Sequence, residues 1–180
     1  MTNMPIWRIR KATVDDAQTL SLIGAATFLD AFAGVIDGQG LLAHCQHAHS
    51  AETYRHYLEN GASAWIAEVE PGDAPVGYAL ICKPELDQAI EGDIELKRIY
   101  VLSRFQGSVI SSVLMRHVLE TAQAAGYKRL LLGVKNDNHR ALGFYAKNGF
   151  ETIGSRSFDV GGTIYDDFVL ARPLDSVPAQ

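Results

Sequence analysis

The chain has 180 residues and a formal net charge of −5, from 16 Lys and Arg against 21 Asp and Glu. Its 47% hydrophobic and 21% charged residues are typical of a soluble globular protein and exclude a disordered or coiled-coil chain. The length corresponds to one ordinary domain, so we expect a single domain over residues 1–180. The acidic balance argues against a partner that is a nucleic acid.

The sequence shows no signal for membrane insertion or secretion. No apolar run approaches the roughly 20 residues of a membrane helix, and Met1–Arg8 lacks the apolar region of a signal peptide. Cys45 and Cys82 are too few for a disulfide framework. We therefore expect a cytoplasmic protein without a membrane partner.

In the first half of the chain, the apolar periodicity predicts a strand, two helices and three strands. The strand at 7–10 alternates apolar and charged residues, and Thr13 then caps a helix that ends before 34–40. The predicted buried face of this helix consists of Ala17, Leu20, Ile23, Gly24, Thr27 and Phe28. The next elements are a helix over Ser50–Asn60 and strands over Ser63–Glu68, Val76–Lys83 and Ile94–Leu102.

The second half continues the alternation. A long helix begins at Val109 and ends near Gly126, and the apolar strand Arg129–Val134 is expected to be buried on both faces. Asn138 caps a further helix that ends at Gly149. Strands over Glu151–Val160 and Tyr165–Ala171 finish the chain. This order indicates an α/β protein with a mixed sheet.

Two segments carry candidate chemistry. The junction 104–112 joins a strand to a helix N-terminus, whose unpaired N–H groups and positive partial charge suit a phosphate. An ordinary strand-to-helix turn is the alternative. The second segment, Asn138–Phe150, directly follows the buried strand and has the pattern Asn-x-x-Ala-x-x-Phe-Tyr-x-x-x-Gly-Phe.

Together these segments resemble the GNAT superfamily of acyl-CoA-dependent N-acetyltransferases, and the resemblance extends from Trp7 to Ala171. It implies a mixed, mostly antiparallel seven-stranded sheet flanked by about four helices. The chain is most similar to the bacterial spermidine/spermine N-acetyltransferase branch, through Glu95–Val101, Leu132–Val134, Phe144–Phe150 and Gly154–Phe158.

The resemblance implies acetyl-CoA as co-substrate and no metal. Ile99, Tyr100 and Val101 would splay from the neighbouring strand and pair with the pantetheine arm, while Asn138 and Tyr145 would also contact the coenzyme. Val109 and Ser111 replace two motif glycines of the family, and a valine side chain can obstruct the approach of the backbone to the pyrophosphate. The pyrophosphate loop would consist of Gln106, Gly107, Ser108, Val109, Ile110, Ser111 and Ser112.

Tyr145 and Glu95 are the predicted catalytic residues. Attack of an amine on a thioester expels a thiolate, which the phenol of Tyr145 can protonate; packing beside Phe144 is the alternative. Glu95 shares a strand face with Asp93 and resembles the acid found here in polyamine acetyltransferases. It would accept the amine proton or bind the substrate, and a solvated carboxylate at the strand edge is the alternative.

Other polar clusters have plainer interpretations. The histidines and cysteine of His44–His49 lack the spacing of a zinc site, so we expect a solvated or substrate-facing segment. Cys82 is expected in the core. We expect a solvated loop to carry the acids Glu85, Asp87, Glu91 and Asp93. Electrostatic attraction of a polycation by these acids is the alternative.

The sequence therefore favours direct transfer of an acetyl group to a primary amine in a ternary complex, with a polyamine as the finer expectation. Acetylation of a protein or antibiotic amine is one alternative. A non-catalytic acyl-CoA-binding or regulatory module, whose phosphate loop has decayed, is another. A homodimer through the C-terminal strands is common in similar proteins.

Overall fold

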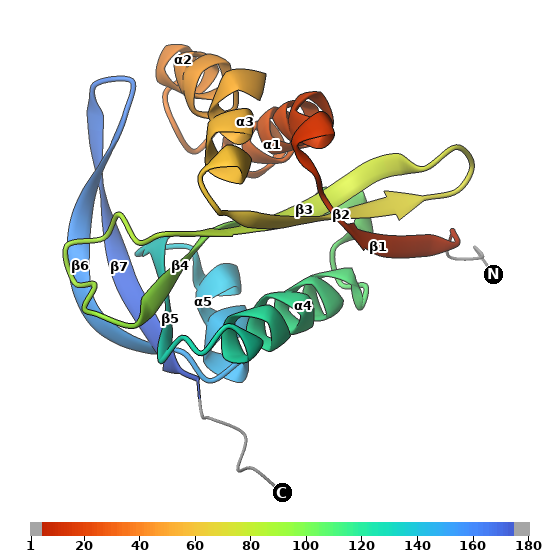
Figure 1. The fold of residues 1–180 in the computed structure, drawn as a ribbon. Helices are drawn as coiled ribbons and strands as arrows, with labels where there is room; N and C mark the ends of the chain where they lie inside the picture. Colours follow the sequence, from red (N-terminus) through yellow and green to blue (C-terminus); the bar gives the residue numbers. More distant parts are fainter. Residues whose placement is uncertain (1–4, 175–180) are drawn as a thin grey trace, which may run out of the picture.

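The computed structural model describes residues 5–174. Both ends of the expected domain over 1–180 lie outside the described residues, and so do residues 1–4 of the segment that was examined for a signal peptide. Seven strands form one sheet in the order β1-β2-β3-β4-β5-β7-β6 (Figure 1). All neighbours are antiparallel except β4 and β5, which are parallel. The strands are β1 (Trp7–Lys11), β2 (Ser63–Val69), β3 (Ala74–Cys82), β4 (Asp93–Val101), β5 (Arg129–Lys135), β6 (Glu151–Val160) and β7 (Thr163–Pro173).

Helices cover both faces of the sheet, with α1, α2 and α3 on one side and α4 and α5 on the other (Figure 1). The predicted α/β fold with a mixed seven-stranded sheet is confirmed, and the described residues form five α-helices where about four were expected. No helix in this part of the chain is long and apolar enough to cross a membrane. The helices are α1 (Ala17–Phe32), α2 (Gly38–Ala48), α3 (Ala51–Glu59), α4 (Ile110–Ala124) and α5 (His139–Lys147).

Separate apolar clusters lie on the two sides of the sheet. Leu20 of α1 and Tyr54 of α3 pack with Tyr78 of β3 on one side, while α4 packs on β2 to β5 on the other. The six predicted buried residues of α1 are all buried. Strand β5 is covered on both faces, as expected, because Leu130 belongs to the α4 cluster and Leu131 packs under Leu86. Cys82 is buried, as predicted.

The predicted helix boundaries have the expected caps. Thr13 and Asp16 form a capping box before α1. The side chain of Ser50 accepts a hydrogen bond from the amide of Thr53 at 3.1 Å at the start of α3. Gly149 has φ +80° just after α5, where a glycine terminates a helix at little steric cost. Local sequence therefore determines where these helices begin and end.

Helix α2 was not predicted, and it contains most of the segment expected to be solvated or substrate-facing. Asp37 caps it by accepting a hydrogen bond from the amide of Gly40 at 3.0 Å. A Cβ atom at Gly40 would lie 2.8 Å from the carbonyl oxygen of Val160, so glycine is required where α2 contacts the end of β6. The two glycines of the first turn lower helix propensity, whereas the packing of Leu41 with Phe28 and Val160 favours the helix here.

A β-bulge changes the direction of side chains in the middle of β4. Leu80 of β3 pairs with Arg98 and Ile81 pairs with Leu96, so Lys97 is an extra residue in the ladder. Lys97 contacts Glu95, whereas Arg98 contacts the aromatic rings of α3. The bulge therefore turns two consecutive cations toward the same face of the sheet, the one covered by α1 to α3.

Candidate functional site

The sheet opens between β4 and β5. These strands pair only at their first residues, where Asp93, Ile94 and Glu95 lie opposite Arg129 to Leu131. Strand β4 then continues to Val101 without pairing with β5. The predicted splay at Ile99 to Val101 is therefore confirmed, and it leaves strand backbone groups of β4 available to a ligand that adds to the sheet edge.

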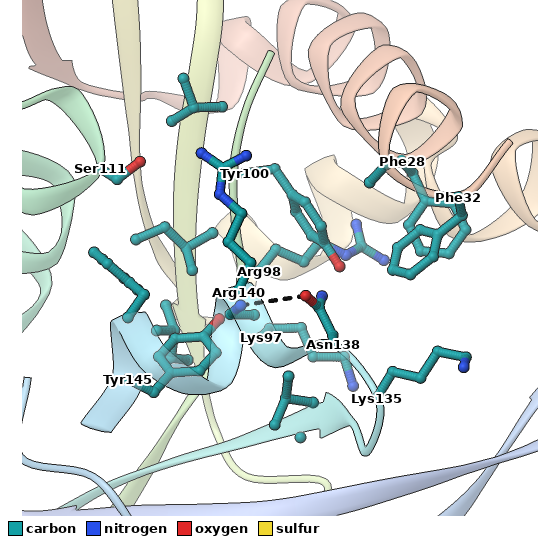
Figure 2. Close-up of a pocket in the computed structure, with 18 of the residues that line it drawn as sticks. Phe28, Phe32, Lys97, Arg98, Tyr100, Ser111, Lys135, Asn138, Arg140 and Tyr145 are labelled. Carbon is teal, nitrogen blue, oxygen red and sulfur yellow. Dashed lines mark hydrogen bonds between the residues drawn. The ribbon is translucent and has the colours of Figure 1, made fainter. Parts of the chain in front are cut away.

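A cavity of about 1040 Å³ occupies this opening. Figure 2 shows Arg98 and Tyr100 of β4 between Tyr145 on one side and Phe28 and Phe32 on the other. Its size is at the upper end of the range for small-molecule sites, about 300–1,000 Å³. Of the predicted site residues, Glu95, Ile99, Tyr100, Val101, Gln106, Gly107, Ser108, Ser111, Ser112, Asn138 and Tyr145 line the cavity, whereas Val109 and Ile110 do not.

The loop before α4 presents backbone amides to this cavity. Gly107 has φ +80°, which lets the chain turn into the helix. Ser111 lines the cavity from the first turn of α4 (Figure 2), where amides have no carbonyl partner within the helix. Val109 is 55% exposed and Ile110 is buried in the core, so neither side chain enters the cavity. Val109 is therefore not part of the cavity wall.

Gln106 joins this loop to two other elements. Its amide nitrogen donates to the carbonyl oxygen of Val101 at 2.9 Å, and its amide oxygen accepts from Arg140 of α5. The loop is thus held at the end of β4 and against α5. The predicted phosphate loop and the helix α5, which carries Tyr145, therefore form one continuous wall of the cavity.

Tyr145 lies on the buried face of α5 and lines the cavity (Figure 2). Its ring packs edge-on against Phe144 and Phe150, each with a centroid separation of 5.6 Å. Burial raises the pKa of the Tyr145 phenol well above its ordinary value, and nearby Tyr100 adds to the shift. The predicted packing and catalytic roles are compatible, because the ring packs in the core while the hydroxyl remains a protonated donor at neutral pH.

Glu95 lines the cavity and is not a solvated residue of the strand edge, since it is only 2% exposed. One carboxylate oxygen accepts the backbone N–H of Glu85 at 2.7 Å, and the other lies 3.6 Å from the ammonium of Lys97. Asp93 is also buried, but its carboxylate pairs with Arg129 at 2.7 Å. The two acids therefore differ in surroundings: Asp93 joins strands, and Glu95 borders the cavity.

The histidines of the predicted solvated segment pack among aromatic rings. The His44 ring lies 4.4 Å from that of Phe28 and lines the cavity, in agreement with a substrate-facing position. His49 is 1% exposed and is therefore not solvated, but it also lines the cavity, in agreement with the substrate-facing alternative. No group of three metal-ligating side chains occurs among residues 5–174.

Sequence reasoning missed Arg98. Its guanidinium donates to the carbonyl oxygen of Ala48 at 2.7 Å and lies 4.9 Å from the ring centre of Tyr54. The signal that could have revealed it is the adjacent pair Lys97–Arg98, because two successive charged residues interrupt the alternation of an otherwise regular strand.

Comparison with known proteins agrees with this geometry. The model of the "Acetyltransferase (GNAT) family" matches residues 37–150. Uncharacterized N-acetyltransferases of Mycobacterium bovis and Mycobacterium tuberculosis are 31% identical over 159 residues, covering 88% of this chain and 98% of theirs.

Solved structures show the same fold. The PaiA N-acetyltransferase of Thermoplasma acidophilum, crystallised in complex with coenzyme A, aligns with a TM-score of 0.74 at 18% identity over 93% of this chain and 99% of that one. A GCN5-related N-acetyltransferase of Rhodopseudomonas palustris gives 0.72 at 19% identity, over 97% and 98% of the two chains. By its sequence and its fold, this chain belongs to the GNAT family and is an N-acetyltransferase.

Proposed function

We propose that the protein transfers an acetyl group from acetyl-CoA to a primary amine by direct attack in a ternary complex. The observation that carries the proposal is the opening between β4 and β5. The cavity in this opening is lined by Tyr145 of α5, which carries a hydroxyl group. The crystallised relative from Thermoplasma acidophilum binds coenzyme A, which supports the choice of donor.

The residues present suit this coenzyme. The unpaired side of Ile99 to Val101 offers backbone groups to an amide-containing arm, and the amides at the start of α4 offer donors to phosphates. Ser111 adds a hydroxyl to that wall. Asn138 borders the same space, although its side chain also caps α5 by accepting from the amide of Ala141 at 3.2 Å.

Two proton transfers accompany the reaction. The coenzyme supplies an activated acyl group when it is bound. Tyr145 holds a proton at its buried hydroxyl and can give it to the departing sulfur. An alkyl ammonium has a pKa near 10.4 on the lysine model and must lose a proton before it attacks. Glu95 is a buried carboxylate of the cavity wall that can accept this proton directly or through water.

The cavity lining argues against the alternative of a decayed, non-catalytic module. That alternative rested on Val109 and Ser111 in place of glycine. Val109 is 55% exposed and does not line the cavity, whereas Ser111 lines it with a small polar side chain.

A polyamine acceptor stays a prediction. It rests on the acids of the loop before β4, of which Asp87 and Glu91 do not line the cavity. Both oxygens of Glu85 are occupied, one by the hydroxyl of Tyr57 at 2.9 Å and the other by Lys97 at 2.6 Å. The cavity therefore offers a polycation little negative charge that is not already paired.

The test is release of free thiol from acetyl-CoA in the presence of an amine panel, preceded by calorimetric titration of acetyl-CoA. We expect binding of acetyl-CoA and amine-dependent thiol release that saturates in both substrates. Binding without thiol release from any amine would support the non-catalytic module instead. The panel should include spermidine, a lysine-containing peptide and an aminoglycoside, so that the alternative acceptors compete directly.

A further inference from the structure

Arg98 lies in the cavity wall without a carboxylate partner. None of the ion pairs found among residues 5–174 includes it, and its Nη1 atom is buried without a hydrogen-bond partner. Its other terminal nitrogen donates to Ala48, and the guanidinium faces the rings of Tyr54 and Tyr57 at 4.9 and 5.8 Å. An arginine cannot lose its proton in a protein, and these contacts compensate its burial only in part, because Nη1 lacks a partner and no anion balances the charge.

The acidic side chains of the cavity are engaged elsewhere. Asp30 accepts from the amide and hydroxyl of Ser103 at 2.7 and 3.0 Å, and Asp167 pairs with Arg156 at 3.2 Å. Glu95 is taken by the amide of Glu85 and by Lys97, as described above. Within the described part of the chain, no carboxylate is left to neutralise Arg98 by direct contact.

The position of Arg98 separates it from the expected phosphate site. The bulge at Lys97 turns Arg98 toward α2 and α3, where it contacts Ala48 and Tyr54. Helix α4, with its free N-terminal amides, packs against the opposite face of the sheet. The anion that Arg98 can receive therefore belongs to the acceptor molecule and not to the pyrophosphate of the coenzyme.

Aromatic rings surround the same end of the cavity. Phe28 and His44 have ring centres 4.4 Å apart, His44 and Phe158 are 5.8 Å apart, and Tyr100 lies 6.3 Å from Phe28. All four residues line the cavity. Such a wall suits an apolar or aromatic substituent, and it offers no additional negative charge to a polycation.

From these contacts the structure assigns the acceptor to amines that also carry a carboxylate and an apolar group, that is, an amino acid or amino-acid derivative whose carboxylate pairs with Arg98. This assignment rests on the proposed function, because it names the substrate class of the same site. The reaction itself is unchanged: the amino group forms the new amide bond, the thioester bond breaks, and the carboxylate only positions the molecule.

The experiment compares phenylalanine, phenethylamine, phenylalaninamide and spermidine as acceptors in thiol-release assays with wild-type protein. Phenethylamine and phenylalaninamide keep the aromatic ring and the amine but lack the carboxylate. We expect phenylalanine to have the highest kcat/KM. A wild-type protein that prefers spermidine, or that does not distinguish phenylalanine from phenethylamine, overturns the assignment while the proposed function stands.

Variants locate the effect at Arg98. In Arg98→Gln the kcat/KM ratio of phenylalanine to phenethylamine should fall by about 30-fold or more, mainly through KM, the size associated with loss of one partner of a buried ion pair. Arg98→Lys should recover part of the ratio. Arg116→Gln, which removes an exposed arginine of α4 outside the cavity, is the matched control and should keep the wild-type ratio. A ratio unchanged in Arg98→Gln contradicts the assignment.

Binding of reaction products supplies a readout that does not depend on turnover or on the variant folding. In the presence of coenzyme A, N-acetylphenylalanine should bind the wild-type protein more tightly than N-phenethylacetamide in calorimetric titration. Equal binding overturns the assignment. Failure of every amine to release thiol would instead contradict the proposed function, so the two failures are distinguishable.

Discussion

The imidazole Nδ1 of His49 lies 2.8 Å from the hydroxyl of Tyr54. That hydroxyl donates its own proton to Tyr78 at 2.9 Å, so His49 must donate from Nδ1. Burial, followed by the charge of Arg98, lowers the pKa of His49 to about 2 and that of His44 to about 4. Both imidazoles are therefore neutral at pH 7, and Arg98 is the cation of this cluster.

The first prediction is a loss of stability in acid that depends on His49. An unfolded histidine titrates near pH 6.5, whereas the folded one resists protonation until about pH 2. The neutral His49 therefore contributes fully to the free energy of unfolding above about pH 6.5. This contribution decreases as the pH falls below about 6.5, because the histidine then binds a proton in the unfolded chain but not in the folded one. We expect the free energy of unfolding to fall by up to about 1.4 kcal/mol per pH unit between pH 6 and 4 from this residue.

Urea unfolding at pH 7, 6, 5 and 4 measures this slope. His49→Gln should give a flatter dependence on pH. His47→Gln changes an exposed histidine of the same segment and serves as the control, with a slope like that of the wild type. Identical slopes for wild type and His49→Gln would contradict the neutral, buried imidazole.

The second prediction concerns the space beneath the same hydrogen bond. A Cβ atom at Gly24 of α1 would lie 2.1 Å from the hydroxyl of Tyr54 and 2.6 Å from Nδ1 of His49. Gly24→Ala should therefore destabilise the protein by about 2 kcal/mol or more, since overpacking and a broken buried hydrogen bond act together. Gly143→Ala in α5 meets no atom within 4 Å and should stabilise by about 0.5–1 kcal/mol. Chemical denaturation measures the free energy of unfolding of both variants. If Gly24→Ala proves as stable as Gly143→Ala, the helix relaxes freely at Gly24 and the prediction is wrong.

The third prediction tests Tyr145 as the proton donor. Tyr145→Phe keeps the ring between Phe144 and Phe150 but removes the hydroxyl. We expect kcat to fall by roughly 10²–10⁴-fold, with little change in the Kd of acetyl-CoA. Tyr127→Phe alters a tyrosine outside the cavity and should leave both parameters at wild-type values. A near-normal kcat in Tyr145→Phe would assign the proton to water and leave the tyrosine a packing role.

The fourth prediction separates the two unusual positions of the loop before α4. Val109→Gly should change the Kd of acetyl-CoA by less than about threefold, because the valine is 55% exposed and does not line the cavity. In Gly107→Ala, φ +80° costs a residue with a Cβ atom roughly 1–2 kcal/mol. We expect the free loop to relax to another conformation, which binding must reverse, so binding should weaken by about fivefold or more. Calorimetric titration of both variants provides the comparison. A clearly tighter Val109→Gly variant would show that the valine does obstruct the coenzyme.

Much of the fold could be predicted because its local signals are strong. The cap at Thr13, the buried spacing of α1 and the glycine after α5 each follow from interactions within a few residues. Helix α2 was missed because its first turn contains two glycines and its apolar packing is non-local: Leu41 belongs to the same cluster as Val160, far away in the sequence. Sequence periodicity contains no information about such a contact.

The site, too, has features that could be predicted from the sequence and features that could not. Tyr145, Asn138 and the loop at Gln106 were named from the resemblance, and all of them line one cavity. The exposure of Val109 and the burial of Glu95 required the three-dimensional structure, since each depends on how the chain turns before α4 and before β4. Arg98 was missed because the bulge reverses the face that simple alternation would give it.

That bulge also determines which length changes β4 can tolerate. Removal of the single residue Lys97 would restore strict alternation along the strand and turn one half of it over. Glu95 would then enter the apolar side occupied by α4, or Arg98 would leave Tyr54, depending on which half moved. Removal of two neighbouring residues would preserve the faces but shorten the strand. A related sequence aligned with a one-residue gap at this position would therefore differ from this protein in its acceptor site even where every other motif agrees.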